Sequence, residues 1–219
     1  MTITLRGDKV YCPMCQWQGK YFVNHNCPNC GSIPRLRLLG YGVEKHNLSD
    51  SEKVLHIAPN MAEFKYVSST FIGLKTYDRL DIKERKQINV AASLTDTGLR
   101  SNFYDSSIIW HVLEHIPEDI KAISELYRVL KLGAKLLVSV PIYPIYNPTT
   151  VEDPSVAYKD YKETYGHYDH CRACGYDYYK RFEEAGFKTV DTIDVRHINQ
   201  SIKSEYGLVD IHVAWCFEK

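Results

Sequence analysis

The sequence predicts an α/β fold: an open, mostly parallel sheet with helices on both faces, preceded by a small metal-binding segment. Short apolar runs alternate with amphipathic stretches from about residue 33 to the end of the chain, which is the pattern of such a sheet. Four of the seven cysteines form two Cys-x-x-Cys pairs near the start. The length of 219 residues suits one domain with a small appendage.

The first part of this pattern reads as helix, strand and helix. Ile33–His46 has apolar residues at near-helical spacing, with Pro34 in its first turn. Lys53–Ala58 is a short apolar run that stops at a proline, as a buried strand would. Asn60 can cap a following helix that extends to about Ser69. The next strands expected along the chain are Thr70–Tyr77, which Asp78 would close, then Gln87–Ala92 and Tyr104–Trp110.

The second part continues the alternation. Ile116–Leu132 is amphipathic and has Pro117 at its start and Gly133 after its end. Ala134–Val140 is an apolar strand ended by a proline. The remaining expected elements are a helix at Tyr176–Ala185 and strands at Phe187–Val195 and Leu208–Phe217.

The overall charge excludes some classes of function. Lys and Arg total 27, and Asp and Glu also total 27, so the formal net charge is zero. This balance argues against broad electrostatic capture of nucleic acid or an anionic membrane. No apolar run reaches the roughly 18 residues that a membrane span needs, and the first residues lack the apolar segment of a signal peptide. We therefore expect a cytoplasmic protein; oligomeric state has no signature in the sequence.

The two cysteine pairs indicate a structural zinc site. Each Cys-x-x-Cys turn can offer two thiolates to one ion, and two turns complete a tetrahedral shell of four sulfurs. The alternative is two disulfides or two redox pairs, but a thioredoxin-like site needs one such motif beside a βαβ unit. The expected ligands are Cys12, Cys15, Cys27 and Cys30.

Two other motifs resemble metal sites and are not favoured. A site from His167, His170, Cys171 and Cys174 would be cramped. His111-Val-Leu-Glu-His115 matches the H-x-x-E-H signature of inverzincin metallopeptidases, which requires one continuous helix. Here an apolar strand leads into His111 and a helix is expected only after His115, so this geometry is not expected.

The expected sheet places one crevice outside the carboxyl ends of its strands. The segments that should surround it are Ala58–Asn60, Asp78, Ser93, Trp110–His115 and Pro141–Tyr143. The glycine pattern G-x-G-x-x-G is absent after the first strand of the sheet, which argues against a dinucleotide site.

Several motifs together resemble class I S-adenosylmethionine (SAM)-dependent methyltransferases with the type 11 domain. These are LHIAPN, HVLEHIPED, ELYRVLKLG and LLVSVP. With CPMCQ, CPNCGSIPRLR and YGHYDHCRACG, the chain is more narrowly similar to members that carry an N-terminal zinc ribbon. The resemblance implies a Rossmann-like class I methyltransferase sheet, a zinc ribbon over residues 1–34, and a methyltransferase domain over 35–219 in which an insert at about 141–175 covers the acceptor.

The resemblance also implies which residues hold SAM. Asp78 would accept hydrogen bonds from the ribose hydroxyls, since a carboxylate offers two acceptor oxygens to a diol. Ser93 and Leu94 would lie beside the adenine, and the residues after the first and fourth strands of the domain would lie near the methionine part. The cofactor-binding residues expected in this way are His56, Ala58, Pro59, Asn60, Asp78, Ser93, Leu94, Trp110, His111 and Leu113.

For the acceptor, the candidates are residues that can take a proton or line a pocket. Methyl transfer needs alignment and, for acidic acceptors, a base; the candidate bases are His115, Asp169 and His170. The insert is rich in tyrosine, which suits a closed pocket, and Tyr143 and Tyr168 are candidate substrate contacts. Arg172 would either bind an anionic acceptor or tie the insert to the domain.

The leading hypothesis is therefore a SAM-dependent methyltransferase that modifies an O, N or S atom of a small molecule. One alternative is RNA or protein methylation with the ribbon recognising the macromolecule, because residues 1–53 carry a slight excess of basic residues. Another is a degenerate methyltransferase fold that only binds ligands, because the first loop of the domain has no glycine.

Overall fold

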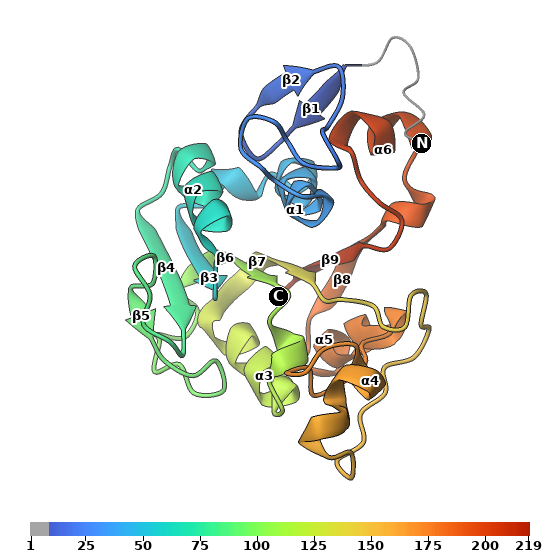
Figure 1. The fold of residues 1–219 in the computed structure, drawn as a ribbon. Coiled ribbons are helices and arrows are strands. Elements are labelled where there is room, and N and C mark those ends of the chain that lie inside the picture. The colour runs from blue at the N-terminus through green and yellow to red at the C-terminus, as the bar shows by residue number, and fades with distance from the viewer. Residues whose placement is uncertain (1–8) are drawn as a thin grey trace.

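The computed structural model describes residues 9–219 and contains a small N-terminal ribbon and one large sheet (Figure 1). The ribbon is an antiparallel pair, β1 (Val10–Cys12) and β2 (Trp17–Gly19). The large sheet has seven strands: β3 (Lys53–Ile57), β4 (Thr76–Asp81), β5 (Val90–Ala91), β6 (Tyr104–Trp110), β7 (Leu130–Ser139), β8 (Lys188–Asp194) and β9 (Val213–Glu218). The helices are α1 (Pro34–Lys45), α2 (Met61–Thr70), α3 (Asp119–Val129), α4 (Tyr161–Tyr165), α5 (Lys180–Glu184) and α6 (Gln200–Tyr206).

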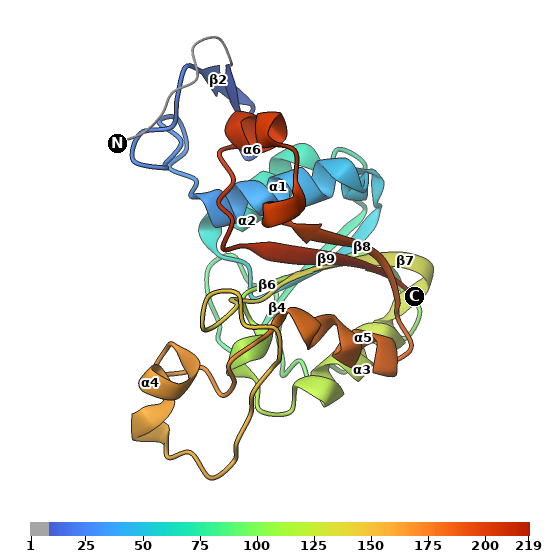
Figure 2. The ribbon, with the colours of Figure 1, turned by 90° about the vertical axis from the view of Figure 1, so that its right-hand side faces the viewer.

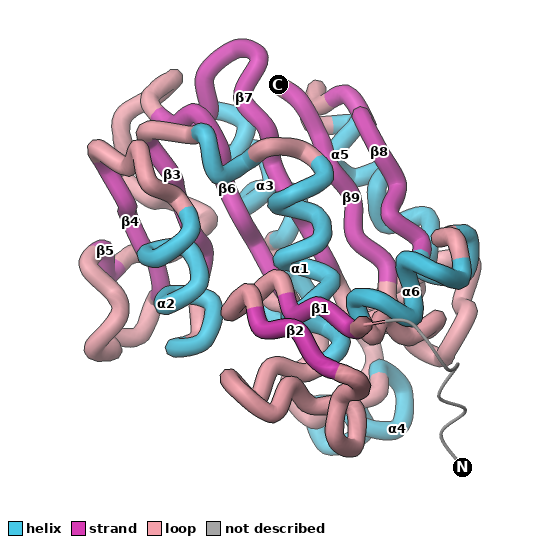
Figure 3. Tube along the Cα trace, turned by 90° about the horizontal axis from the view of Figure 1, so that it is seen from above, coloured by secondary structure: helices cyan, strands magenta, loops and turns pink. Residues whose placement is uncertain are grey.

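The strand order confirms the predicted fold class. Across the sheet the order is β5-β4-β3-β6-β7-β9-β8, which can be followed in Figure 3. The pairs from β5 to β7 are parallel, and β9 is antiparallel to both of its neighbours. The order reverses between β3 and β6, and an open α/β sheet binds its ligands at such a switch point, outside the carboxyl ends of the strands.

Helices cover both faces of the sheet (Figure 2). On one face, α3 and α5 bury Leu126 and Phe182 in a core that includes Leu136 of β7. On the other face, α1 and α2 bury Val43 and Val67 in a second core. The two cores are separate because side chains of successive strand residues point to opposite faces.

The ribbon packs against α1 and α6 (Figure 1). Its Cys12 and Cys27 belong to the same buried cluster as Leu38 and Leu39 of α1. The Arg37 guanidinium is fully buried and donates to the carbonyl oxygens of ribbon residues and of the turn after α6. The ribbon is therefore bound to the sheet domain through shared packing.

Most expected elements are confirmed, and the bounds of several are corrected. The strand expected at Gln87–Ala92 is only Val90–Ala91, and the strand expected from Ala134 begins at Leu130. The strand expected at Thr70–Tyr77 begins only at Thr76 and runs to Asp81. The helix expected to reach Leu132 ends at Val129, where β7 begins. The last strand begins at Val213, and the short helices α4 and α6 were not expected. Within residues 9–219, no helix is both long and apolar enough to span a membrane.

Candidate functional site

A cavity of about 590 Å³ opens at the carboxyl ends of β3, β4 and β6, at the switch point of the sheet. Its volume is in the range of cofactor and small-molecule sites. The lining residues that matter for binding are Ala58, Asp81, Ser93, Leu94, His111 and His115. Five of these six were expected near a cofactor or acceptor; Asp81 was not.

The loop between β3 and α2 turns tightly without glycine. Ala58 has a φ of 47°, and its amide donates to the Leu80 carbonyl at 2.6 Å. A non-glycine residue in this left-handed region costs about 1–2 kcal/mol. Asn60 then caps α2, because its Oδ1 accepts from the amides of Ala62 and Glu63, and the Glu63 carboxylate accepts from the Asn60 amide. The cap holds the loop in place, so glycine is not required for this turn.

Asp81, the last residue of β4, places a carboxylate in the cavity. It is 7% exposed, and its Oδ1 accepts from the Lys83 amide at 3.0 Å. The Arg85 Nε lies 3.5 Å from Oδ2. Each carboxylate oxygen has one such partner and two acceptor sites, so the group keeps acceptor capacity beside the cavity.

Asp78 does not close β4, so that expectation is wrong. It pairs with Leu55 inside the strand and is absent from the cavity lining. Its carboxylate accepts from the Tyr104 hydroxyl at 2.6 Å and from the Asn89 amide at 3.1 Å. Both oxygens are engaged in bonds between neighbouring strands and loops, and the acidic position at the strand end is three residues later.

Some of the other expected cofactor residues line the cavity, and two lie in the loop beside it. Ser93 and Leu94 line the cavity, as does His111, which has a φ of 55°. Burial lowers the pKa of His111 well below its ordinary value, so its imidazole is neutral at pH 7. Pro59 and Asn60 lie in the adjoining loop and do not line the cavity.

Three expected cofactor residues are buried away from the cavity, so their side chains do not lie where the sequence analysis expected them. His56 is fully buried, with its Nδ1 3.0 Å from the Tyr77 hydroxyl. Trp110 packs in the core on the α1 face, and Leu113 packs in the core on the α3 face. Residues at strand ends alternate between faces, and the sequence alone does not give the register that selects which one meets the cavity.

The three candidate bases come together beside the cavity, although His115 is far from Asp169 and His170 in the sequence. The segment Leu113–His115 forms a single 3₁₀ turn, and the loop after α4 lies against it. The Nδ1 of His115 lies 3.2 Å from both the carbonyl oxygen and the carboxylate of Asp169. The rings of His115 and His170 are 4.8 Å apart between centroids.

Burial shifts the pKa of two groups in this cluster. It raises the pKa of the Glu114 carboxyl to about 8 and lowers that of His170 to about 4. Glu114 is 1% exposed, and its Oε1 lies 3.7 Å from the Nε2 of His115 and from the Nδ1 of His111. The H-x-x-E-H segment thus bends from strand to 3₁₀ turn, and the continuous helix of a peptidase is absent from it.

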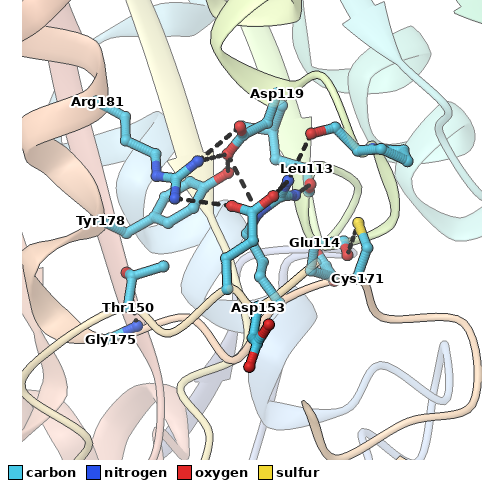
Figure 4. A network of polar contacts seen from close by, with 12 residues as sticks. Leu113, Glu114, Asp119, Thr150, Asp153, Cys171, Gly175, Tyr178 and Arg181 are labelled. Atoms are coloured by element: carbon cyan, nitrogen blue, oxygen red, sulfur yellow. Dashed lines mark hydrogen bonds and ion pairs between the residues drawn. The ribbon is translucent and has the colours of Figure 1, made fainter. Parts of the chain in front are cut away.

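Arg172 ties the insert to the domain and has no donor left for an acceptor. Its guanidinium is fully buried and donates to the carbonyl oxygens of Leu113, Ile116 and Pro117 and to both Glu152 oxygens. These bonds use all five N–H groups. The neighbouring ion pair is drawn in Figure 4, where Arg181 and Tyr178 point at the Asp119 carboxylate.

The two expected tyrosine contacts lie outside the cavity lining. Tyr143 packs over Gly166, where a Cβ would lie 2.6 Å from its ring. Tyr168 is 59% exposed, and its ring lies 4.3 Å from that of His167 at an angle of 37°. In this structure both residues build the insert itself, and neither faces the cavity between β4 and β6.

The four ribbon cysteines converge on one point. Their sulfurs lie within 4.8 Å of one another, and Cys12–Cys30 and Cys15–Cys27 are each 3.7 Å apart. A disulfide needs about 2.05 Å, whereas a tetrahedral zinc with bonds of about 2.3 Å separates its sulfurs by about 3.8 Å. The cluster is therefore compatible with a small zinc site. Among the described residues, Cys171 and Cys174 belong to no cluster of this kind.

The comparisons with known proteins agree with this architecture. A family model described as a methyltransferase domain matches residues 55–138, which run from β3 to β7 and include Asp81 and the H-x-x-E-H segment. Over these residues the chain is similar to a methyltransferase domain. The comparison with curated proteins found no match.

Solved structures share the fold of this chain at low identity. A SAM-dependent methyltransferase from Archaeoglobus fulgidus has a TM-score of 0.58 and 16% identity, covering 85% of this chain and 95% of that one. The 1,6-didemethyltoxoflavin-N1-methyltransferase from Burkholderia thailandensis, with its substrate and S-adenosylhomocysteine bound, has a TM-score of 0.57 and 13% identity, covering 84% and 78%. The cyclase SpnF scores 0.57 at 15% identity, covering 85% and 81%. Since a cyclase shares the fold, the fold alone does not fix the reaction.

Proposed function

We propose that this protein transfers the methyl group of SAM to an O, N or S atom of a small-molecule acceptor. The observation that carries the proposal is the cavity itself, whose lining includes both the Asp81 carboxylate and the His115–Asp169 pair. The carboxylate suits a ribose diol, and the pair suits a group that must lose a proton.

The residues present fit the cofactor. The free acceptor capacity of Asp81 suits the ribose hydroxyls, and Ser93 and Leu94 offer a hydroxyl and an apolar surface for the adenine. The left-handed turn at Ala58 brings backbone to the cavity wall where a glycine would otherwise be needed. When bound, SAM supplies a methyl group on a positively charged sulfur, ready for in-line attack.

On the acceptor side, we propose that the histidine cluster promotes loss of the acceptor's proton. His115 lines the cavity, and Asp169 fixes its ring through the contacts to Nδ1. Arg172 has a positioning role, because it fixes the carbonyls of the turn that carries His115. Zinc in the ribbon would be structural, since four cysteine sulfurs leave no open position.

A transfer experiment with labelled SAM tests this proposal. The protein is incubated with methyl-labelled SAM and a cell extract divided into small-molecule and macromolecular fractions. We expect label in the small-molecule fraction, and at least tenfold less with His115→Ala, which should still bind S-adenosylhomocysteine. Label confined to RNA or protein would contradict the acceptor class, and no transfer despite cofactor binding would favour a non-catalytic binding module.

A further inference from the structure

We propose that Glu114, His115 and His170 bind a divalent transition-metal ion at the edge of the cavity. One nitrogen or oxygen from each of these residues lies within 4.8 Å of the others. The site is separate from the four cysteines of the ribbon, which form their own cluster. The chain would therefore hold two ions with different donor sets.

The hydrogen bonds of both histidines leave one nitrogen of each ring free to bind an ion. The Nδ1 of His115 lies 3.2 Å from the carbonyl oxygen of Asp169, and the Nδ1 of His170 lies 3.2 Å from that of Tyr165. A carbonyl only accepts, so each Nδ1 carries the proton and each Nε2 keeps its lone pair. Histidine ligands of metals are commonly fixed in this way by an acceptor on the other ring nitrogen.

The buried carboxylate of Glu114 lacks a partner that an ion would supply. Glu114 is 1% exposed, its Oε2 makes no hydrogen bond within the described part of the chain, and its Oε1 is 3.7 Å from the Nε2 of His115. A polar atom that is buried without a partner is costly. A cation bound by the Glu114 carboxyl group through Oε2 would give this atom a partner.

The site differs from that of a metallopeptidase even though it uses part of the same motif. Glu114 and His115 lie on a 3₁₀ turn, and the third donor comes from the loop that follows α4. Two imidazoles and one carboxylate suit zinc, manganese, iron(II) or cobalt(II) better than magnesium or calcium, which prefer oxygen ligands. Three protein ligands also leave coordination positions open.

The ion would determine which class of acceptor is methylated. This consequence rests on the proposed function. His115 lines the cavity, so an open position of the ion borders it. An acceptor whose oxygen or nitrogen coordinates the ion loses its proton more readily, because the ion stabilises the resulting anion. The acceptor would then carry a metal-coordinating hydroxyl, carboxylate or ring nitrogen.

Metal counting on the full-length protein tests the site without any methyl transfer. The protein is loaded with excess zinc, dialysed against micromolar zinc, and analysed for zinc per chain. We expect two ions in the wild type and one in His170→Gln and in Glu114→Gln. The matched control is His197→Gln, a histidine whose side chain is 79% exposed and outside the cluster, and this variant should keep two. One ion in the wild type, or two in both site variants, overturns the proposal.

A cobalt titration of the wild-type protein tests the same site without variants, so it does not depend on whether the variants fold. The first equivalent should give the strong thiolate charge-transfer absorption of a four-sulfur site. The second should add only weak bands without thiolate charge transfer, because its donors are nitrogen and oxygen. A second equivalent with thiolate absorption, or none at all, overturns the inference. S-adenosylhomocysteine binding is measured separately, so failure of the metal site and failure of the proposed function are distinguishable.

Discussion

The carboxylate that ends β4 has the environment of a ligand-binding group. Asp81 is 7% exposed, lines the cavity and keeps acceptor capacity free, whereas both oxygens of Asp78 are used inside the fold. An anionic acceptor in a sheltered position makes stronger hydrogen bonds than a neutral one. At the residue scale, we therefore propose that cofactor binding depends on Asp81 and not on Asp78.

Replacing Asp81 by Asn should weaken S-adenosylhomocysteine binding by about 10- to 100-fold. The reason is the loss of hydrogen bonds to a charged acceptor, each about 1.5–3 kcal/mol. Calorimetric titration measures the change, with Asp78→Asn as the matched control, since the same substitution there lies outside the cavity. Equal weakening in both variants, or none in Asp81→Asn, would contradict the assignment.

The sequence predicted the roles of several single residues, but it did not predict Asp81 as the acidic residue at the end of β4. The four cysteines and the Asn60 cap follow from local spacing, and the structure has both arrangements. The end of β4 is set by its pairing with β5, in which Leu80 is opposite Val90 and Asp81 is opposite Ala91. That register is a long-range contact, so the short-range pattern placed the strand end three residues too early.

At the element scale, the insert between β7 and α5 is held by a buried ion network. Arg172 connects it to the turn after β6, and Arg181 pairs with Glu152 and Asp119. Backbone carbonyls of three domain residues depend on one guanidinium for their hydrogen bonds. The insert therefore fixes the position of His170 relative to His115.

Replacing Arg172 by Met should lower the free energy of unfolding by about 3–5 kcal/mol. The variant removes one partner of a buried network and leaves acceptors without donors. Denaturant-induced unfolding measures the change, and Arg100→Met, at an exposed arginine, is the control, with an expected change below about 0.5 kcal/mol. A loss in Arg172→Met no larger than in the control would show that the network is dispensable.

Glu125 on α3 should make the free energy of unfolding depend on pH. The Arg128 guanidinium, together with Thr97, lowers the pKa of Glu125 to about 2. A folded-state pKa below the unfolded value of about 4.5 stabilises the fold above pH 4.5, and this contribution is lost as the pH falls towards 2. Glu125→Gln should therefore be less stable than the wild type at pH 7, and the difference should shrink by pH 3. A difference that is constant with pH would contradict this coupling.

At the scale of the whole molecule, the ribbon and the sheet domain share one core. Cys12 and Cys27 are buried with Leu38 and Leu39, and Tyr206 of α6 packs against Tyr11 of the ribbon. We propose that zinc orders the part of the expected ribbon that the structure describes, residues 9–34, and so strengthens its packing on α1. Residues 1–8 of the expected ribbon lie outside the described residues, and residues 35–219 would form the methyltransferase domain. A ribbon of this size cannot bury enough apolar surface to fold without such support.

Loss of the ribbon zinc should lower the melting temperature of the whole protein. We expect Cys30→Ser to melt about 5–10 °C below the wild type, because the cluster and the packing on α1 weaken together and about 2–4 °C corresponds to 1 kcal/mol at this chain length. Thermal denaturation monitored by circular dichroism measures this. Cys171→Ser, which changes a cysteine outside the cluster, should melt close to the wild type. Equal melting temperatures for both variants would argue against structural zinc.

The sheet was predictable because alternating apolar runs and amphipathic helices are local patterns, and β6 begins and ends where they indicate. The short helices α4 and α6 were missed because few of their residues are buried, so their sequences carry little apolar periodicity. Joining of the insert to the domain was one of the two roles left open for Arg172. Its partners in the H-x-x-E-H turn could not be predicted, because they are carbonyl groups far away in the sequence.

A crystal structure with S-adenosylhomocysteine tests the central claim most directly. The account predicts that the ligand occupies the cavity between β4 and β6, with its ribose hydroxyls within hydrogen-bond distance of Asp81 and its adenine beside Ser93 and Leu94. A ligand bound elsewhere, or a ribose that contacts Asp78 in place of Asp81, would contradict it.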